Sequence, residues 1–505
     1  MAYKLVVLWT DVALWGLLAG LLAYGLRIRA HPQLRATWAR VLRDPVAASS
    51  GVVLTLMLGV TLLDSLHLRS ELPPGAAGQK MQAEQTSDER VYDTRTVSVL
   101  DLLLARQIAM REISYSAPLA YLGFNKEPID AAGEGVGYGT RTEGEAGSEA
   151  AGRGFPRLQF GGAHLRQPEQ EWGADVARRA GAGLAWGALL TALLAILLAA
   201  GLATSHGGFK SAGRDLLMDR THYPWRAMLL TCAVTALLAG PALALMDHYH
   251  VLGTDRTGND VLYQALKSLR TAFVIGALST LATLPFALAL GVLAGYFRGW
   301  VDEVVQYLYT TLSSVPNVLL IAACVLMVQV FLDKNPDLFE TGVERADLKM
   351  FMLCLILGVT GWAGLCRLVR AETLKLRELD YVQAAHAFGV SHGRIMARHV
   401  LPNVLHLVLI SVVLSFSELI LYEAVLTYVG VGVDPTMNSF GSMINLARSE
   451  MSSDPVVWWS FCAAFGFMLT LVLAANLFAD GVRDAFDPRS RNARPHRSKT
   501  LKVRG

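Results

Sequence analysis

The sequence is poor in charged residues. Only 17% of its 505 residues are charged, and 53% are hydrophobic, whereas about a quarter of the residues in an ordinary soluble protein carry charge. Several windows of about 20 apolar residues are long enough to cross a bilayer. This composition excludes an ordinary soluble globular protein. It predicts a polytopic protein embedded in a lipid bilayer.

Other signals are also missing. No CxxC pair occurs, and all five cysteines fall in or beside apolar runs, so we expect packing residues and no disulfide framework. The histidines, including His248 and His250, show no metal-ligand spacing, so we expect no metal site. No GxxxxGK[ST] phosphate loop is present, so the sequence carries no nucleotide-binding motif of this type. We therefore expect no catalytic residue, no cofactor held by this chain and no nucleic-acid partner.

Long apolar runs set the expected fold, an all-α integral membrane protein with about nine transmembrane helices. The first run contains Trp9, Trp15 and Tyr24 and is followed by no small-x-small cleavage site, which favours a retained span over a signal peptide. The expected spans are residues 5–26, 46–66, 183–203, 227–246, 271–295, a sixth ending near 331, 349–369, 403–426 and 456–479. Pro316 should kink or unwind the chain before the sixth span.

A polar insert divides the chain. Residues 67–182 contain no window long enough to span; 96–122 has helical spacing and 128–155 is loop-like. The expected organisation is 1–66 with two spans, the 67–182 insert, 183–246 with two more spans, a 247–489 core and a 490–505 basic tail.

Lysine and arginine in the loops predict the orientation. Segments 27–45, 204–226, 370–402 and 481–505 are net basic, and nine spans place all of them on one side. The N-terminus and the insert are then outside, and the C-terminus is in the cytoplasm.

One polar stretch, 379–402, lies between two apolar runs on the cytoplasmic side. It predicts a helix built on Ala384, Ala385 and Ala387, ended by Gly389 in a left-handed conformation. Ser391 should cap a second helix, and Pro402 should start the next span. Such a hairpin is rigid enough to fit a groove in another protein; the alternative is an ordinary connecting loop.

This stretch resembles the coupling motif of binding-protein-dependent ABC importer permeases, the MetI-like fold. The pattern is E-A-A, three residues, G, nine residues, I-x-L-P. Gln383, Ala384, Ala385 and Gly389 are followed by His399, Leu401 and Pro402 at this spacing. Gln383 and His399 depart from the glutamate and the isoleucine of the pattern.

Further stretches resemble the dipeptide and oligopeptide permease subfamily, and in particular its OppC/DppC-type subunit. LGTDRTGNDVLYQAL (252–266) resembles LGTDxxGRDVLSR, with Asn259 in place of arginine. GYFRGWVDEVVQYLYTTLSSVP, EAVLTYVGVGVDPTMNSFGSMI and LFADGVRDAFDPR resemble three more signatures, and 40–60 resembles the N-terminal span. The likeness runs in order over about 250–489. Such permeases have fewer spans, so the first span and the 67–246 segment are additions.

The resemblance implies a function: a permease subunit of an ATP-driven importer for dipeptides or oligopeptides in the bacterial inner membrane. The implied partners are a paralogous permease chain, two ATP-binding subunits that carry ATP and Mg, and an extracytoplasmic solute-binding protein. The chain itself is then not an enzyme. The residues implied to couple to the ATPase are Gln383, Ala384, Ala385, Gly389, Arg394, Arg398, Leu401 and Pro402. Arg394 and Arg398 are alternatively only positive-inside residues.

Two further groups of residues are candidates. Pro316, Asn317, Glu418 and Glu423 are candidates for the translocation path or its gate, because ionisable groups at membrane depth usually face a cavity. The alternative is that both glutamates are simply hydrated near the outer surface. Asp255, Arg256 and Asp260 are candidates for contact with the binding protein; alternatively, they cap the following helix.

The sequence is also compatible with other transport functions. Related permeases carry nickel, opines or glycosides, and the sequence does not name the substrate. A self-contained secondary transporter would need internal repeats and mid-membrane charges, and no convincing repeat is present.

Overall fold

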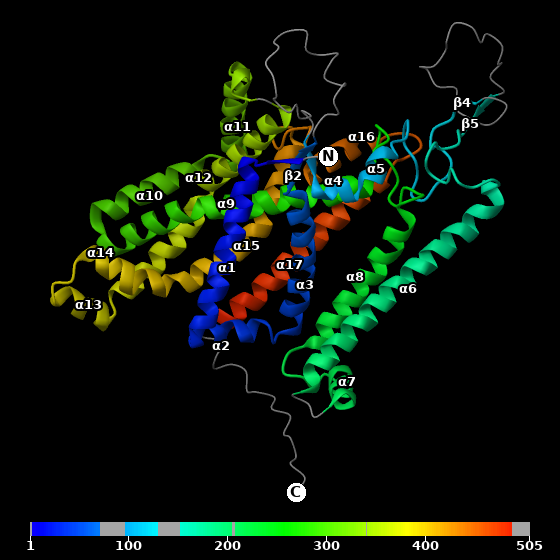
Figure 1. The fold of residues 1–505 in the computed structure, drawn as a ribbon. Coiled ribbons are helices and arrows are strands. Elements are labelled where there is room, and N and C mark those ends of the chain that lie inside the picture. Colours follow the sequence, from blue (N-terminus) through cyan, green and yellow to red (C-terminus); the bar gives the residue numbers. More distant parts are fainter. Residues whose placement is uncertain (1–2, 71–95, 130–151, 205–207, 340, 487–505) are drawn as a thin grey trace, which may run out of the picture.

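The structure is a computed structural model, and it describes residues 3–70, 96–129, 152–204, 208–339 and 341–486. It is mainly helical (Figure 1). The helices are α1 Trp9–Ala30, α2 Pro32–Val41, α3 Pro45–Asp64, α4 Val99–Leu103, α5 Ala105–Ala109, α6 Pro168–Ala203, α7 Phe209–Leu217, α8 Trp225–Leu245, α9 Val261–Phe297, α10 Gly299–Ser314, α11 Asn317–Lys334, α12 Gly342–Arg377, α13 Asp380–Ala387, α14 His392–Ile395, α15 Leu401–Tyr428, α16 Phe440–Glu450 and α17 Trp459–Phe486.

Nine helices in the described part of the chain are long and apolar enough to cross a membrane, as predicted. They are α1, α3, α6, α8, α9, α11, α12, the part of α15 from Leu407, and α17. Pro316 lies in the break between α10 and α11, which confirms the predicted interruption of the chain. The fold is therefore the all-α polytopic bundle that the sequence predicts.

Short strands tie the N-terminus to the beginning of the insert. β1 (Tyr3–Val6) pairs antiparallel with β2 (His67–Ser70), which pairs with β3 (Val97–Ser98). A second small sheet pairs β4 (Glu127–Ile129) with β5 (Gly152–Gly154). The predicted helix in 96–122 is limited to α4 and α5, and most of the loop-like 128–155 segment lies outside the described residues.

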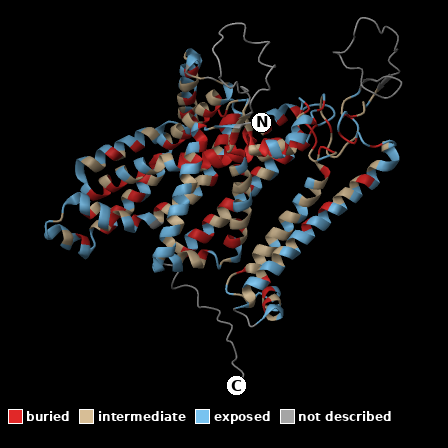
Figure 2. Ribbon diagram, in the orientation of Figure 1, coloured by how far each residue is buried: buried red, intermediate tan, exposed pale blue. Residues whose placement is uncertain are grey.

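The permease core is built around α9, which packs along α12 for most of its length and also contacts α3, α15 and α17. A Cβ added to Gly358 of α12 would lie 2.4 Å from the Cβ of Ala282, so the two helix backbones approach closely. Buried residues are concentrated along this central part of the bundle (Figure 2).

Helices α6 and α8 form a separate pair beside the core. A Cβ added to Gly183 would lie 2.4 Å from the carbonyl oxygen of Gly240, which is the close backbone approach typical of small residues in membrane helices. Both helices are exposed over most of their outer faces (Figure 2). They lie on the opposite side of the bundle from α13 and α14 (Figure 1).

The insert packs onto the loop that precedes α9. The N–H of Ser116 in the insert donates to the Thr254 hydroxyl at 2.7 Å. Trp459 of α17 holds the same loop from the core side, because its indole N–H donates to the Thr254 carbonyl at 2.9 Å. The N–H of Glu112 donates to the carbonyl of Gly258 at 3.0 Å. The insert therefore covers the 252–260 signature stretch.

Candidate functional site

The 379–402 stretch forms the predicted helix–glycine–helix hairpin. α13 ends at Ala387, and Gly389, two residues later, has a φ of +74°. The N–H of Gly389 donates to the His386 carbonyl, and the N–H of Val390 donates to the Ala385 carbonyl at 3.1 Å. These two bonds satisfy the last carbonyls of α13 in a Schellman motif, which requires the left-handed residue.

The second half of the hairpin differs from the prediction. Ser391 occupies the N-cap position of α14, but its side chain makes no capping hydrogen bond. The chain then continues through a π-helical turn, Met396–Val400, directly into α15. Pro402 lies in the first turn of α15, where its missing N–H costs no bond. The second helix is therefore continuous with the membrane span.

Buried apolar residues fix the hairpin to the core. Val382 and Ile395 pack with Val369 and Leu376 of α12 and with Tyr296 of α9. Of the predicted coupling residues, six are exposed, Gln383, Ala384, Gly389, Arg394, Arg398 and Pro402, while Ala385 and Leu401 are half-buried. Most of the predicted coupling residues are thus accessible on this chain.

Phe388 stands at the tip of the hairpin and was not singled out from the sequence. It is 87% exposed, the largest exposed fraction among the exposed large hydrophobic residues of the described chain. Beside the hairpin lies a pocket of about 490 Å³ lined by Tyr296, Arg377, Gln383 and His392, among others. An exposed aromatic next to a hollow is typical of a protein–protein contact. A large apolar residue directly before the left-handed glycine is the sequence signal that predicts it.

A second feature is a cavity of about 350 Å³ in the membrane part of the core. It brings together Asn317 of α11 and Glu418 of α15, two of the predicted path residues. Gly361 and Gly364 of α12 form part of its wall, and no atom lies within 4 Å of a Cβ added to Gly364. Pro316 is exposed next to Asn317 and does not line the cavity.

One face of α15 supplies the polar lining of this cavity. Ser411, Ser415, Glu418 and Tyr422 all line it, and their spacing of four, three and four residues places them on one side of a helix. The serines and the tyrosine were not predicted. A polar stripe at helical spacing in an apolar span is the signal that identifies them.

Glu423 has a different environment from Glu418. Its side chain is 1% exposed and accepts a hydrogen bond from the Thr427 hydroxyl at 2.9 Å. The same hydroxyl accepts from the N–H of Val433 at 3.2 Å. The other carboxylate oxygen, Oε2, has no hydrogen-bond partner among the described residues. Glu423 therefore holds the loop after α15 and does not line the cavity.

The three residues predicted to contact a binding protein are placed mainly inside. Asp260 is 5% exposed, accepts from the N–H of Tyr263 at the start of α9 and binds the ring of His250 at 2.9 Å. Asp255 is 9% exposed and accepts from the N–H groups of Thr257 and Asn259. The structure thus gives Asp260 the helix-capping role that was the alternative prediction, whereas Asp255 holds the turn that precedes α9. Arg256 is exposed.

His250 links this loop to the insert, because its second ring nitrogen lies 3.5 Å from the Glu112 carboxylate. Burial alone would lower the pKa of His250, but hydrogen bonds to Asp260 and Glu112 raise the pKa to about 9. Burial also opposes ionisation of Glu112, but hydrogen bonds from His250 and from the N–H groups of Gly161, Phe160 and Gln159 lower its pKa. The ion pair is therefore fully charged near neutral pH.

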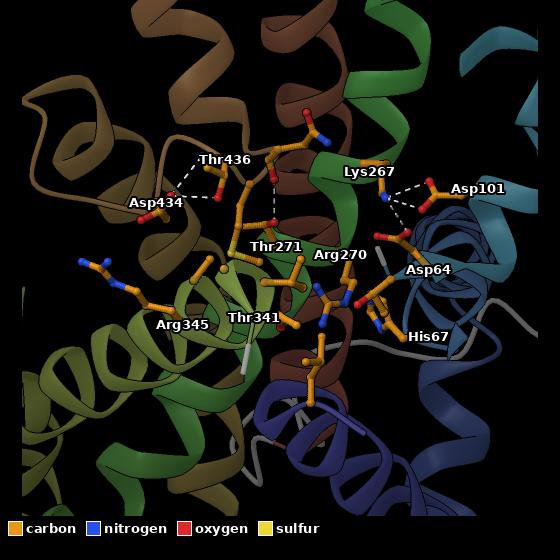
Figure 3. Close-up of a pocket in the computed structure, with 17 residues that line it drawn as sticks. Asp64, His67, Asp101, Lys267, Arg270, Thr271, Thr341, Arg345, Asp434 and Thr436 are labelled. Carbon is orange, nitrogen blue, oxygen red and sulfur yellow. Dashed lines mark hydrogen bonds and ion pairs between the residues drawn. The ribbon is translucent and has the colours of Figure 1, made fainter. Parts of the chain in front are cut away.

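A cluster of buried charges lies at the same end of the core, beside an open pocket of about 810 Å³ (Figure 3). Arg270 of α9 is 4% exposed and lies 2.7 Å from Asp11 of α1 and 3.6 Å from Asp347 of α12. The ring of His67 contacts Asp11 at 2.8 Å. Lys267 of α9 lies 2.8 Å from Asp101 of α4 and 3.5 Å from Asp64 of α3.

These charges connect the additional elements to the core. Asp11 and Asp101 come from α1 and from the insert, whereas Arg270 and Lys267 belong to α9. An unpaired buried cation is costly, so this end of α9 depends on carboxylates from the additional elements as well as on Asp347 of α12. Polar groups on the far side of the pocket, Asp434 and Thr436, bind each other at 2.8 Å (Figure 3).

The fold and these sites define a polytopic membrane transport protein with an exposed helical hairpin and a polar cavity within its span bundle. Comparison with known proteins agrees. Residues 287–492 match the family described as "Binding-protein-dependent transport system inner membrane component". The chain is 32% identical over 245 residues to the oligopeptide transport system permease protein OppC of Mycobacterium tuberculosis (strain ATCC 25618 / H37Rv), covering 48% of this chain and 78% of the relative.

Two other relatives have similar identity and match the same share of this chain. The dipeptide transport system permease protein DppC of Alkalihalophilus pseudofirmus is 30% identical, and the glutathione transport system permease protein GsiD of Pectobacterium atrosepticum is 31% identical. Each match covers 48% of this chain and 73% of the relative. The chain therefore belongs to the family of binding-protein-dependent transport system inner membrane components. It is a multi-pass permease subunit of an ABC importer and not an enzyme.

Proposed function

We propose that the protein is a permease subunit of an ATP-driven importer for dipeptides or oligopeptides, with α13 and α14 as the coupling segment. The observation that carries this proposal is the hairpin: buried Val382 and Ile395 fix it to the core, and Phe388 and Arg394 are exposed. The sequence has no phosphate loop, so a rigid exposed hairpin supplies the required contact with an ATPase. The names of the relatives support peptides as the substrate class.

The proposed assembly contains this chain, a paralogous permease chain, two ATP-binding subunits and an extracytoplasmic binding protein. The chain would supply half of the translocation path, with the cavity at Asn317 and Glu418 on the side that faces the substrate. Its polar α15 face and its glycine wall suit a hydrated polar solute such as a peptide. ATP-driven closure of the ATPases would then switch the permease between two states, as in alternating access.

We place the N-terminus outside and the C-terminus in the cytoplasm. The basic segments support this orientation, because α2 and α7 lie at one end of the bundle and the small sheet with α4, α5 and α16 lies at the other (Figure 1). The insert then covers the outer loop before α9. A binding protein would meet the insert and Arg256, since Asp255 and Asp260 are buried.

The test is reconstitution with the partner subunits in liposomes, measuring ATP hydrolysis and uptake of labelled peptides in the same preparation. Gly389→Pro removes the N–H bond to His386 and forbids a φ of +74°, so we expect hydrolysis to continue while uptake is lost. Gly393→Ala is the control, because no atom lies within 4 Å of its added Cβ and its φ is not in the left-handed range. Wild-type uptake by Gly389→Pro would refute the coupling role.

Competition identifies the substrate class. Uptake should be inhibited by unlabelled dipeptides and oligopeptides and not by nickel ions, an opine or a glycoside. A preparation without ATPase that transports on an ion gradient alone would overturn the proposal in favour of a secondary transporter.

A further inference from the structure

Helix α7 lies between the two spans of the additional helix pair, and it has two different surfaces. Ala212 and Leu216 are buried against the pair. Three apolar residues at its ends, Phe209, Leu217 and Met218, are 51%, 75% and 54% exposed. A short helix with exposed apolar residues at the end of a transmembrane pair is suited to lie at the lipid–water boundary.

Cations gather on the same segment. Lys210, Arg214, Arg220 and Arg226 are all exposed, and none of them forms an ion pair among the described residues. Two acids, Asp215 and Asp219, are interspersed among them. The cations outnumber the acids, so the segment keeps a positive surplus.

A cation from a distant part of the chain adds to this surface. Arg43, in the turn between α2 and α3, places its Nη2 atom 2.5 Å from Nε2 of His222 and its guanidinium 6.0 Å from the centre of the Tyr223 ring. The neighbouring carboxylate, Asp44, is occupied as the cap of α3, where it accepts from the N–H of Ala47 at 3.0 Å. An arginine and a histidine therefore meet at this junction, and no carboxylate of the described residues is paired to either.

We propose that the junction formed by Arg43, His222 and Tyr223, together with the exposed cations Lys210 and Arg214 on the same segment as His222, binds the phosphate headgroup of an anionic phospholipid. Nε2 of His222 accepts from Arg43, so the other guanidinium N–H groups of Arg43 and the Nδ1–H of His222 are the donors suited to a phosphate. Tyr223 and Trp225, whose rings lie 6.2 Å apart, are the aromatic residues typical of a membrane interface. The exposed apolar residues of α7 would contact the acyl chains.

The lipid has a structural role at this place. α8 contacts the core along α3, and the pair is otherwise exposed on its outer faces. A headgroup held by Arg43 on one side and by α7 on the other would fasten the additional pair to the core at this end of the bundle, where α2 and α7 both lie (Figure 1). This inference goes beyond the proposed transport function and does not depend on the substrate.

The experiment is native mass spectrometry of the full chain, purified in detergent, stripped of lipid and titrated with phosphatidylglycerol. We expect tighter binding of phosphatidylglycerol than of phosphatidylcholine. Each cation near a headgroup contributes about fivefold in affinity, so Arg43→Gln combined with His222→Gln should weaken phosphatidylglycerol binding about fivefold or more. Arg35→Gln is the matched control, because it removes an exposed cation of α2 at the same end of the bundle.

A second variant separates loss of the ligand from loss of the Arg43–His222 contact. Arg214→Gln leaves that contact intact and should also weaken phosphatidylglycerol binding about fivefold. Unchanged binding by either set of variants would overturn the proposal, as would an equal loss in Arg35→Gln. Equal binding of phosphatidylcholine, or displacement of the lipid by inorganic phosphate at similar concentration, would show that the junction does not select an anionic lipid.

Discussion

Replacing Asp11 by asparagine should destabilise the protein through Arg270. The Arg270 side chain is 5% exposed, and Asp11, at 2.7 Å, is its nearest carboxylate. The remaining carboxylate, Asp347, lies 3.6 Å away and also accepts hydrogen bonds from Thr10. Removing one partner of a buried ion pair costs about 3–5 kcal/mol. Because Asp347 remains, we expect a loss of about 3 kcal/mol in the free energy of unfolding.

The assay is denaturant unfolding of the purified chain in detergent micelles, with the free energy obtained by linear extrapolation. Asp337→Asn is the control, since Asp337 is exposed and forms no ion pair among the described residues. Arg270→Met completes a double-mutant cycle with Asp11→Asn, and neighbours in one network should show a coupling of about 0.5–3 kcal/mol. A loss below about 0.5 kcal/mol for Asp11→Asn, the range of ordinary surface substitutions, would refute the role assigned to the cluster.

Three further outcomes are expected. The folded pKa of His250 is raised from 6.5 to about 9. Its stabilising contribution is therefore complete below about pH 6.5 and is lost as the pH rises through 9. The protection of the insert amides from hydrogen exchange, relative to an unfolded chain at the same pH, should fall over that range in the wild type and show no such step in His250→Gln. Gly364→Leu should fill the cavity and lower peptide uptake without lowering stability, whereas Gly466→Leu, also free of atoms within 4 Å but outside the cavity lining, should leave uptake unchanged. Phe388→Ala should weaken ATPase binding in a pull-down by more than tenfold, as for an interface anchor, with unchanged thermal stability; equal binding would contradict the contact assigned to Phe388.

Local signals made much of this fold predictable. Apolar runs located all nine candidate spans, and Gly389 located the end of α13, because hydropathy and turn chemistry act over a few residues. The same local signals misplace helix ends where the composition changes within a helix. α6 begins at Pro168, well before the predicted 183, because its first turns are polar and hydropathy detects only the part that suits lipid.

The sites were less predictable. Asn317 and Glu418, two of the predicted path candidates, line one cavity. Glu423, chosen for the same reason as Glu418, faces the loop after α15, because a charge in a span does not reveal the direction of its side chain. Arg270 and Asp11 are separated by 259 residues, so no local pattern could join them. The position of Phe388 directly before Gly389 was a usable sequence signal, but only the structure shows that its side chain is 87% exposed.

The π-helical turn at Met396–Val400 has a mechanical consequence. Since α14 runs through it into α15 without a break, the stretch from Ile395 to Glu418 is one rod of about 35 Å at 1.5 Å per residue. In the proposed assembly, one end of this rod would contact the ATPase, and the other carries the polar stripe of the cavity. If the coupling proposal holds, a small tilt of this helix at the ATPase surface would displace Glu418 inside the membrane, so the ATPase contact and the cavity would lie on a single continuous helix.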